Sequence, residues 1–204
     1  QINYGIKTGF NDAFIINTEK RDEILSNCQT EDERARTAEL IRPILRGRDI
    51  KRYGYNWTGL YLIATFPSRH YDIEKYPAVK NYLLGFGIER LEQTGKSHIV
   101  NGEKIKARKK TNNKWFETQD SISYWEDFSK QKIMYPDISE KLNFCLVNDV
   151  VYCNNTVYFM VSKTENLERL LKFLNSNLID WYYRTISVQL GEAAVRMFSI
   201  YVLN

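Results

Sequence analysis

The segment TENLERLLKFLNSNLIDWYYRTI, residues 164–186, decides the expected fold class because it carries the strongest helical pattern in the chain. Four of its leucines follow the first at spacings of 3, 4, 7 and 11 residues, which places all five on one face of a helix. They are Leu167, Leu170, Leu171, Leu174 and Leu178. We predict one long helix here, with this leucine face packed in the core.

Short segments rich in β-branched and aromatic residues precede this helix and predict strands. They are AFIIN (13–17), LYLIATFP (60–67), KIMYPDI (132–138), NFCLV (143–147) and TVYFMV (156–161). Strands and helices therefore mix along the chain, and the longest helix comes late. We predict an α+β fold, a mixed β-sheet domain with a C-terminal helical part.

Two further helices are expected in the first half of the chain. Residues 30–33 (TEDE) have the Thr-x-x-Glu form of a capping box and predict a helix that Pro43 ends. Pro77 suits a first helical position, and residues 78–93 behind it are expected to be helical despite two glycines. Residues 95–114 are polar, basic and glycine-containing, which predicts a loop or a hairpin.

The chain of 204 residues, with 43% apolar and 26% charged residues, has the composition of a globular protein with a real core. No Pro/Gly/Ser-rich linker interrupts it, so we predict a single domain over residues 1–204. The chain opens at Gln1 and stops in the mostly apolar run 198–203. Both ends look cut, and we expect a fragment of a longer protein.

Membrane and secretory classes do not fit the sequence. No apolar run approaches the ~20 residues that a membrane span requires, and no signal peptide opens the chain. Cys28, Cys145 and Cys153 are an odd count without paired spacing, which indicates reduced thiols in a cytoplasmic protein.

Familiar catalytic motifs are missing from the sequence. His70 and His98 have no second ligand at metal spacing, and the G-x-G at residues 85–87 lies in an expected helix. The Pro-Asp pair at 136–137 suggests a nuclease, but the acidic-x-Lys triplet that its metal site needs occurs only upstream, at 49–51. We therefore predict no catalytic centre, metal or cofactor in this chain, with Asp137 capping a turn.

The net charge of +4, from 29 basic and 25 acidic residues, hides a polarised distribution. Residues 42–52 hold five basic residues and one acid, residues 96–114 hold seven basic residues and one acid, and residues 19–39 hold seven acids and four basic residues. Aromatic residues follow both basic clusters, a combination that suits nucleic-acid phosphates and bases. The alternatives are solvated loops or a site for an acidic protein partner.

Four segments resemble one family in their order and spacing. They are GIKTGFNDAFII (5–16), LIRPILRGRDIKRY (40–53), WFETQDSISYWEDFSKQKIMYPDIS (115–139) and LLKFLNSNLIDWYYRTIS (170–187). The pattern resembles the TaqI-like C-terminal specificity domain, the target recognition module of adenine-specific DNA methyltransferases and of fused type IIG restriction–modification enzymes. The resemblance implies that the partner is double-stranded DNA, recognised by sequence and positioned for adenine methylation.

The resemblance also implies that the chemistry lies outside this chain. In that family an upstream methyltransferase domain binds S-adenosylmethionine and methylates a flipped adenine, with an Asn-Pro-Pro-aromatic motif as its hallmark. The four prolines of this sequence are never adjacent, so that motif is absent. We expect S-adenosylmethionine, and Mg²⁺ if a nuclease is present, in the absent domains, with the upstream domain as a second partner.

The first group of expected site residues lies near the start of the chain. Lys7, Thr8 and Asn11 are assigned to a turn near the DNA backbone or the catalytic domain. The alternative is that this turn serves only the fold, through Gly5 and Gly9.

The two basic clusters supply the other expected DNA contacts. Arg42, Arg46, Arg48 and Lys51 are assigned to phosphates or bases, with internal ion pairs to the acidic helix over 31–39 as the alternative. The DNA-facing loop is expected to comprise Lys104, Lys106, Arg108, Lys109, Lys110 and Lys114. Asp137 is assigned a structural role in preference to reading cytosine.

Two other functions stay open from sequence. One is a protein- or RNA-interaction module that uses the same basic loops. The other is the recognition domain of a phage-defence methyltransferase that modifies DNA without cutting it.

Overall fold

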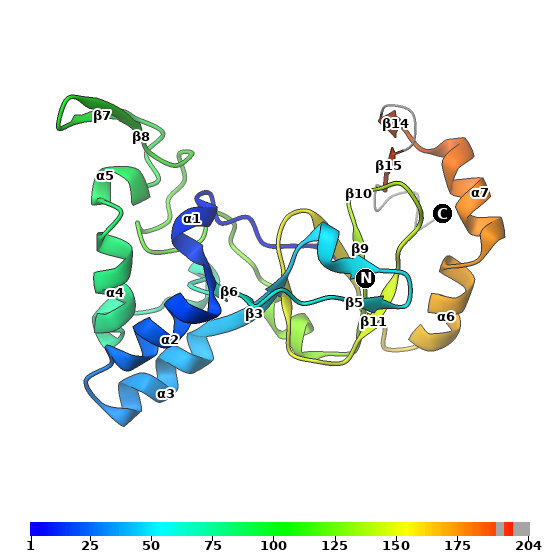
Figure 1. Cartoon of the computed structure of the whole chain (residues 1–204), viewed down its shortest axis with the longest axis horizontal. Coiled ribbons are helices and arrows are strands. Elements are labelled where there is room, and N and C mark those ends of the chain that lie inside the picture. Colours follow the sequence, from blue (N-terminus) through cyan, green and yellow to red (C-terminus); the bar gives the residue numbers. More distant parts are fainter. Residues whose placement is uncertain (191–193, 198–204) are drawn as a thin grey trace. The chain divides into compact units, whose positions relative to one another are not determined.

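The computed structural model describes residues 1–190 and 194–197 of the chain (Figure 1). Two compact units alternate along the sequence. The first unit comprises Gln1–Gly5, Ile44–Thr58 and Tyr124–Asn204, and the second comprises Ile6–Pro43 and Gly59–Ser123. The single domain over 1–204 stays a prediction, and the apolar run 198–203 lies outside the described residues.

An antiparallel sheet forms the centre of the first unit. Its strand order is β1 (Ile2–Tyr4), β13 (Val157–Met160), β9 (Lys132–Pro136) and β11 (Cys145–Val147). Helices α6 (Leu167–Leu174) and α7 (Asn177–Ile186) flank this sheet (Figure 1). The apolar core that joins sheet and helices includes Ile133, Tyr135, Phe144, Met160, Leu167, Leu171, Leu174 and Tyr183.

The predicted single helix over 164–186 is wrong, because the chain breaks between α6 and α7. The side chain of Asn175, which is 2% exposed, accepts a hydrogen bond from the Phe144 amide and donates one to the Phe144 carbonyl. Ser176 then caps α7 by accepting from the Ile179 amide. The new helix axis leaves Leu178 66% exposed, so this residue does not join the predicted leucine face.

Short elements complete the first unit. Strand β12 pairs in parallel with Ile44 and Leu45, the last residues of β3 (Ile41–Leu45). The 3-10 turn η1 (Gly47–Asp49) leads into the small β4–β5 hairpin, and β10 pairs with β15. The bounds are β4 Ile50–Lys51, β5 Gly54–Tyr55, η4 Trp125–Ser129, β10 Ile138–Ser139, β12 Tyr152–Cys153, β14 Gln189–Leu190 and β15 Ala194–Arg196.

The second unit combines a small antiparallel sheet with several helices. Strand β6 (Leu60–Ile63) pairs with β2 (Ile15–Asn17) on one side and with residues 41–43 of β3 on the other. Strands β7 (Ser97–Val100) and β8 (Glu103–Lys106) form a separate hairpin. The helices are α1 Asn11–Phe14, α2 Thr18–Ser26, α3 Glu31–Leu40, α4 Pro77–Leu84 and α5 Ile88–Leu91, with 3-10 turns η2 Pro67–Arg69 and η3 Ile73–Lys75.

The α+β fold and the hairpin within 95–114 are confirmed, whereas two early predictions need correction. The predicted strand over 13–17 begins only at Ile15, because the preceding residues form the last turn of α1. The Thr30 hydroxyl accepts from the Glu33 amide as the capping box predicts, but the helix ends at Leu40. Pro43 lies instead in strand β3, opposite Tyr61.

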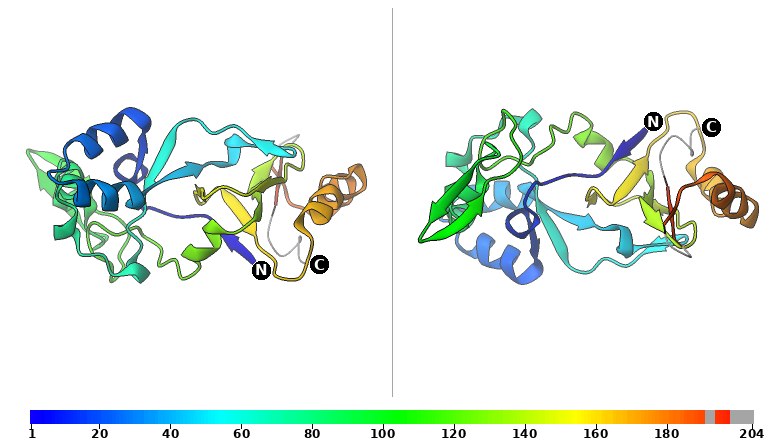
Figure 2. Two further views of the ribbon diagram at one scale, coloured as in Figure 1. Left: turned by 90° about the horizontal axis from the view of Figure 1, so that it is seen from below. Right: turned by 90° about the horizontal axis from the view of Figure 1, so that it is seen from above.

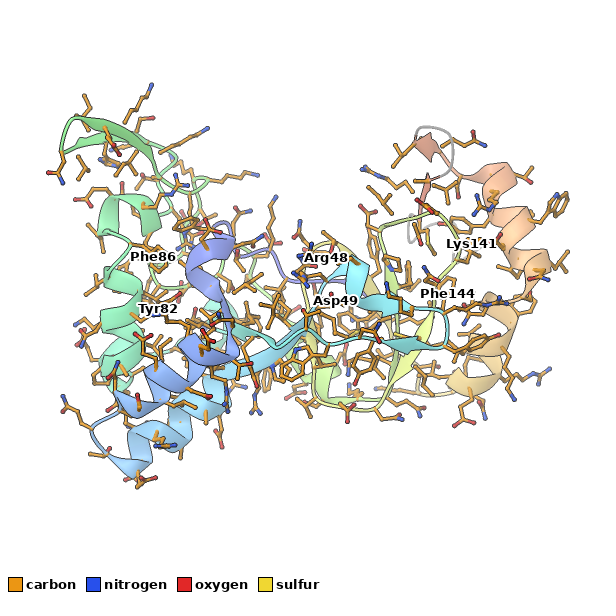
Figure 3. The ribbon with its side chains drawn as sticks, viewed as in Figure 1. Arg48, Asp49, Tyr82, Phe86, Lys141 and Phe144 are labelled. Atoms are coloured by element: carbon orange, nitrogen blue, oxygen red, sulfur yellow. The ribbon has the colours of Figure 1, made fainter. Side chains whose placement is uncertain are left out.

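The predicted helix over 78–93 is also broken, after Leu84. Gly87 adopts φ +83°, a left-handed conformation that glycine tolerates and that interrupts a helix. The Phe86 ring contacts the Tyr82 ring, labelled with it in Figure 3, at a centroid distance of 5.5 Å. It also contacts the Phe10 ring at 5.6 Å. The Phe86 and Gly87 amides donate to the Leu83 and Leu84 carbonyls, so the main chain stays hydrogen-bonded through the break.

Candidate nucleic-acid interface

The second basic cluster lies on the β7–β8 hairpin and in the residues that flank it. The two strands of the hairpin lie side by side in Figure 2, with Ser97 opposite Lys106 and Val100 opposite Glu103. Asn101 and Gly102 turn the chain with φ values of +51° and +84°, the Asn-Gly geometry that suits a tight hairpin. Six lysines of this cluster are exposed: Lys96, Lys104, Lys106, Lys109, Lys110 and Lys114. We call these six residues the lysine surface.

The segment that carries the lysine surface is almost free of acidic residues, and Glu92 from outside it pairs with His98 of β7. Glu103 is the one acid between positions 96 and 114. Among the residues that the structure describes, none of the six lysines forms an ion pair. Lys114 lies over the Phe116 ring, with Nζ 5.6 Å from the ring centroid. The positive charges therefore face solvent without neutralisation from the protein.

Arg108 belongs to the same cluster but is only 4% exposed. Its guanidinium donates to the carbonyl oxygens of Leu91, Thr8, Glu117 and Trp115. Burial lowers the pKa of Arg108 to about 10, which Glu117 partly opposes, so the group stays charged at neutral pH. The prediction that Arg108 faces DNA is wrong, because main-chain carbonyls occupy its donors.

The turn near the start of the chain is tightly packed. Lys7 and Asn11 are exposed as expected, but Thr8 is 1% exposed and its hydroxyl donates to the Asn11 side chain. The Thr8 side chain is therefore held within the turn, and the assignment of this turn to the DNA backbone or the catalytic domain stays a prediction. A Cβ on Gly5 would lie 2.0 Å from the Asn154 carbonyl oxygen, and one on Gly9 would lie 3.0 Å from Gln119. Both glycines therefore serve the fold.

The first basic cluster is divided between the two units. Arg42 is half-buried on β3 in the second unit, whereas Arg46, Arg48 and Lys51 belong to the first unit. Arg46 pairs with Asp49 instead of the acidic helix over 31–39, with its guanidinium 3.0 Å from the carboxylate. Arg48 and Lys51 are exposed, as the predicted DNA contacts require.

Exposed aromatic residues follow the first cluster but not the second. Tyr53 and Trp57 are 51% and 41% exposed, which leaves both rings partly open to solvent. Phe116, behind the lysine surface, is only 4% exposed. Base stacking by Phe116, suggested by the sequence pattern, is therefore excluded by its burial.

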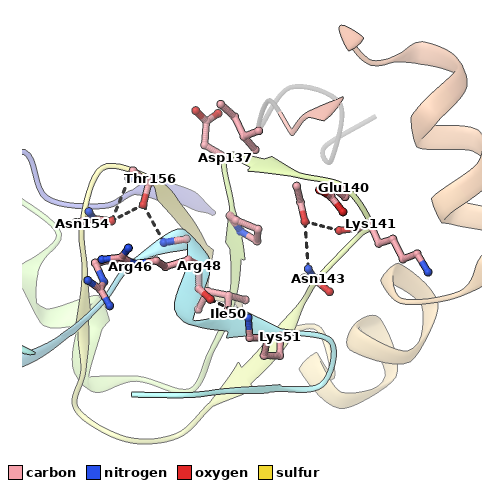
Figure 4. A pocket seen from close by; sticks show the side chains of 14 residues that line it. Arg46, Arg48, Ile50, Lys51, Asp137, Glu140, Lys141, Asn143, Asn154 and Thr156 are labelled. Carbon is pink, nitrogen blue, oxygen red and sulfur yellow. Dashed lines mark hydrogen bonds between the residues drawn. The ribbon is translucent and has the colours of Figure 1, made fainter. Parts of the chain in front are cut away.

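A pocket of about 810 Å³ in the first unit adjoins the turn η1. Turn η1, strand β4, the β9–β11 connection and the β12–β13 turn all contribute to its lining (Figure 4). We call it the η1 pocket, and its charged and amide groups include Arg48, Lys51, Asp137, Glu140, Lys141 and Asn143. Its size lies in the range of ligand-binding pockets.

Hydrogen bonds hold the η1 side of this pocket in place. The Asp49 carboxylate accepts from the Arg46 amide at 2.8 Å and from the Arg46 guanidinium at 3.0 Å. The Gly47 amide donates to the Thr156 hydroxyl at 2.8 Å, and that hydroxyl donates to the Asn154 side chain. Lys51 donates to the Arg48 carbonyl at 2.9 Å. The turn is therefore fixed from three sides.

Asp137 lies half-buried at the edge of the η1 pocket. Its amide donates to the Thr156 carbonyl, and its carbonyl accepts from the Met197 amide. Burial raises the pKa of its carboxyl group, and Arg196 opposes that shift.

Over residues 1–190 and 194–197, no three His, Cys, Asp or Glu side chains cluster in a way that could hold a metal ion. In the same part of the chain, no helix is long and apolar enough to span a membrane.

Several residues of the η1 pocket were not expected from sequence. Lys141, Asn143, Asn154 and Thr156 come from loops that are about 90 to 110 residues from Arg48 along the chain. None lies in a charge cluster, and loop residues follow no periodic pattern. Their proximity depends on the pairing of β9, β11 and β13, which folding brings together.

Comparison with known proteins gives a family and a fold. Among solved structures, the chain is similar to the Type IIL restriction–modification enzyme MmeI, solved in complex with DNA, at 15% identity and a TM-score of 0.60. The similarity covers 98% of this chain and 23% of that chain. No curated protein matches. A model of the TaqI-like C-terminal specificity domain matches residues 42–203, and the chain belongs to this family.

Proposed function

We propose that this chain binds duplex DNA as the sequence-recognition domain of a restriction–modification enzyme. The lysine surface carries the proposal, because it concentrates exposed and unpaired positive charge on the β7–β8 hairpin and the residues that flank it. Family membership and the fold shared with MmeI support it.

Electrostatics predict how the affinity of such a surface for DNA depends on salt. Each lysine that neutralises a phosphate releases condensed counterions, so affinity falls as salt rises. The slope of log affinity against log salt is about −0.9 per phosphate contacted. Acidic residues would weaken this effect, and Glu103 is the one acid within the segment 96–114. The lysine surface therefore suits the sequence-independent part of DNA binding.

The experiment measures binding of the 204-residue chain to random-sequence duplex DNA over a range of salt concentrations. The test variant replaces Lys104, Lys106 and Lys109 by Ala. The matched control replaces three exposed lysines elsewhere by Ala, namely Lys75, Lys163 and Lys172. Both variants lose three charges, so total charge alone cannot distinguish them.

The wild-type chain and the control variant are expected to show steep salt dependence. The test variant is expected to bind more weakly, and its slope is expected to fall by about one for each phosphate that it no longer neutralises. A flat salt response of the wild type would overturn the proposal. Preference for single-stranded RNA, or for a polyglutamate peptide, over duplex DNA would support the interaction-module alternative instead.

We propose further that the DNA is positioned for adenine methylation by an upstream domain of the same protein in the cytoplasm. That domain would bind S-adenosylmethionine, and Mg²⁺ where a nuclease is also present. The absence of an Asn-Pro-Pro motif from this chain supports a separate catalytic domain. Methylome sequencing of cells that express the full-length protein tests this, with methyladenine in one motif expected. A cleavage assay separates a restriction enzyme from a phage-defence methyltransferase that only modifies.

A further inference from the structure

The η1 pocket differs from the lysine surface in the chemistry that it presents. Arg48, Lys51 and Lys141 supply donors, whereas the carboxylates of Asp137 and Glu140 are acceptors. Carboxylates repel phosphates, so a surface built only for the DNA backbone would not combine them with these cations. Base edges, in contrast, present both acceptors and donors in the major groove. The mixed lining therefore suits base edges better than phosphates.

Arg48 combines a fixed main chain with a free side chain. The Arg46–Asp49 ion pair and the Gly47–Thr156 hydrogen bond hold the turn on both sides of Arg48. Across the part of the chain that the structure describes, the Arg48 guanidinium has no hydrogen-bond partner or ion pair. Arg46 directly precedes the turn η1 and Arg48 lies within it (Figure 4), but only Arg46 is neutralised by Asp49.

Because the turn is fixed, Arg48 loses less conformational entropy when it binds a ligand. A side chain on a rigid turn retains its main-chain position, so only its own rotamers must be ordered when it meets a ligand. The planar guanidinium matches the O6 and N7 acceptors of guanine with two parallel hydrogen bonds.

We propose that Arg48, exposed at the rim of the η1 pocket, enters the major groove and determines specificity there by reading guanine. This inference rests on the proposed DNA-binding function. Arg46 is then a positioning residue, which fixes the turn that carries Arg48. The lysine surface contributes affinity for any sequence, and Arg48 selects among sequences.

The experiment selects bound duplexes from a random library and compares the wild type with Arg48→Ala and Arg48→Lys. Arg169→Ala is the matched control, because Arg169 is an exposed arginine of α6 in the same unit. Unfolding midpoints of all variants check that each is folded. The salt slope is measured for each variant on the wild-type consensus duplex.

The wild type and R169A are expected to select the same motif, which contains at least one guanine. R48A is expected to accept any base at one guanine position and to bind the consensus about 10- to 100-fold more weakly, with an unchanged salt slope. R48K is expected to keep charge without restoring the guanine preference, because lysine lacks the planar fork.

Each of the other possible results contradicts either this inference alone or the proposed function as well. A uniform loss of affinity over all sequences, with the slope reduced by about one, would make Arg48 a phosphate contact and overturn the inference alone. If R48A kept the wild-type motif and affinity, the η1 pocket would lie outside the DNA interface. That result would also overturn the inference alone. Salt-dependent wild-type binding with no preferred sequence would overturn the inference and the specificity part of the proposed function. No salt-dependent binding would overturn both.

Discussion

The Arg108 guanidinium donates to the Thr8 carbonyl oxygen over 2.9 Å, across 100 residues of sequence. Its other bonds, to the carbonyls of Leu91, Glu117 and Trp115, join two further segments of the second unit. The basic segment 96–114 therefore has two kinds of cation. Its lysines face solvent, while its one arginine holds the segment to the rest of the unit.

Replacing Arg108 by Ala is expected to lower the free energy of unfolding by about 3 kcal/mol, because four carbonyl oxygens lose a charged donor. Urea unfolding followed by circular dichroism measures the change. Lys109→Ala is the matched control, since Lys109 is adjacent and exposed, and it is expected to change stability by less than about 0.5 kcal/mol. Equal midpoints for the two variants would contradict a structural role for Arg108.

Replacing Gly5 by Ala is expected to destabilise the first unit by about 2–3 kcal/mol, because the new Cβ would meet the Asn154 carbonyl and the chain must shift. The control is Gly54→Ala, where nothing lies within 4 Å of the added Cβ. Thermal unfolding of both variants checks the prediction. If G5A were as stable as G54A, the close approach of these two chain segments would be ruled out.

The Arg46–Asp49 pair is expected to show a coupling energy of about 1–2 kcal/mol in a double-mutant cycle of R46Q and D49N. Asp49 has a side chain only 2% exposed, which strengthens the charge-assisted bonds. The Lys20–Glu23 pair serves as control, because its side chains are 39% and 55% exposed. A coupling below about 0.5 kcal/mol is expected there. Similar values for both cycles would count against the fixed η1 turn.

The buried thiols are expected to make stability depend on alkaline pH. Burial raises the pKa of Cys145 from 9.0 to about 12, and Lys132 opposes that shift. The pKa of the Cys145 thiol is higher in the folded state than in the unfolded state, so the unfolded state releases the thiol proton at lower pH. The stability that the buried thiol contributes below pH 9 is therefore lost as the pH rises towards 12. The stability difference between the wild type and Cys145→Ala is therefore expected to narrow between pH 8 and 10.5, by at most about 1.4 kcal/mol per pH unit.

The same burial predicts which thiol reacts first. Cys28 is half-buried, while Cys145 and Cys153 are fully buried. Alkylation of the native protein followed by mass spectrometry is expected to label Cys28 before the other two, which require unfolding. A constant stability difference across pH, together with rapid labelling of Cys145, would refute the buried-thiol account.

Local patterns in the sequence determined much of this protein. The capping box at Thr30 and most of the strand segments depend on neighbouring residues, so the sequence predicts them without the fold, and it predicted a loop or a hairpin over residues 95–114. The charge clusters and the family pattern are likewise linear features. They were sufficient for the fold class and for membership of the TaqI-like specificity domain family.

Tertiary structure alone decided which charges face outward and where helices break. Arg108 and its neighbouring lysines count equally as positive charges in the sequence. In the fold, Arg108 is buried against main-chain carbonyls, whereas the lysines are exposed. Helix α6 ends at Asn175, whose side chain bonds to the main chain of Phe144, 31 residues away beside strand β11. The helical pattern of the sequence cannot predict this contact. The η1 pocket needs loops brought together by strand pairing. Burial and pocket formation are properties of contacts between remote segments, so only the folded chain specifies them.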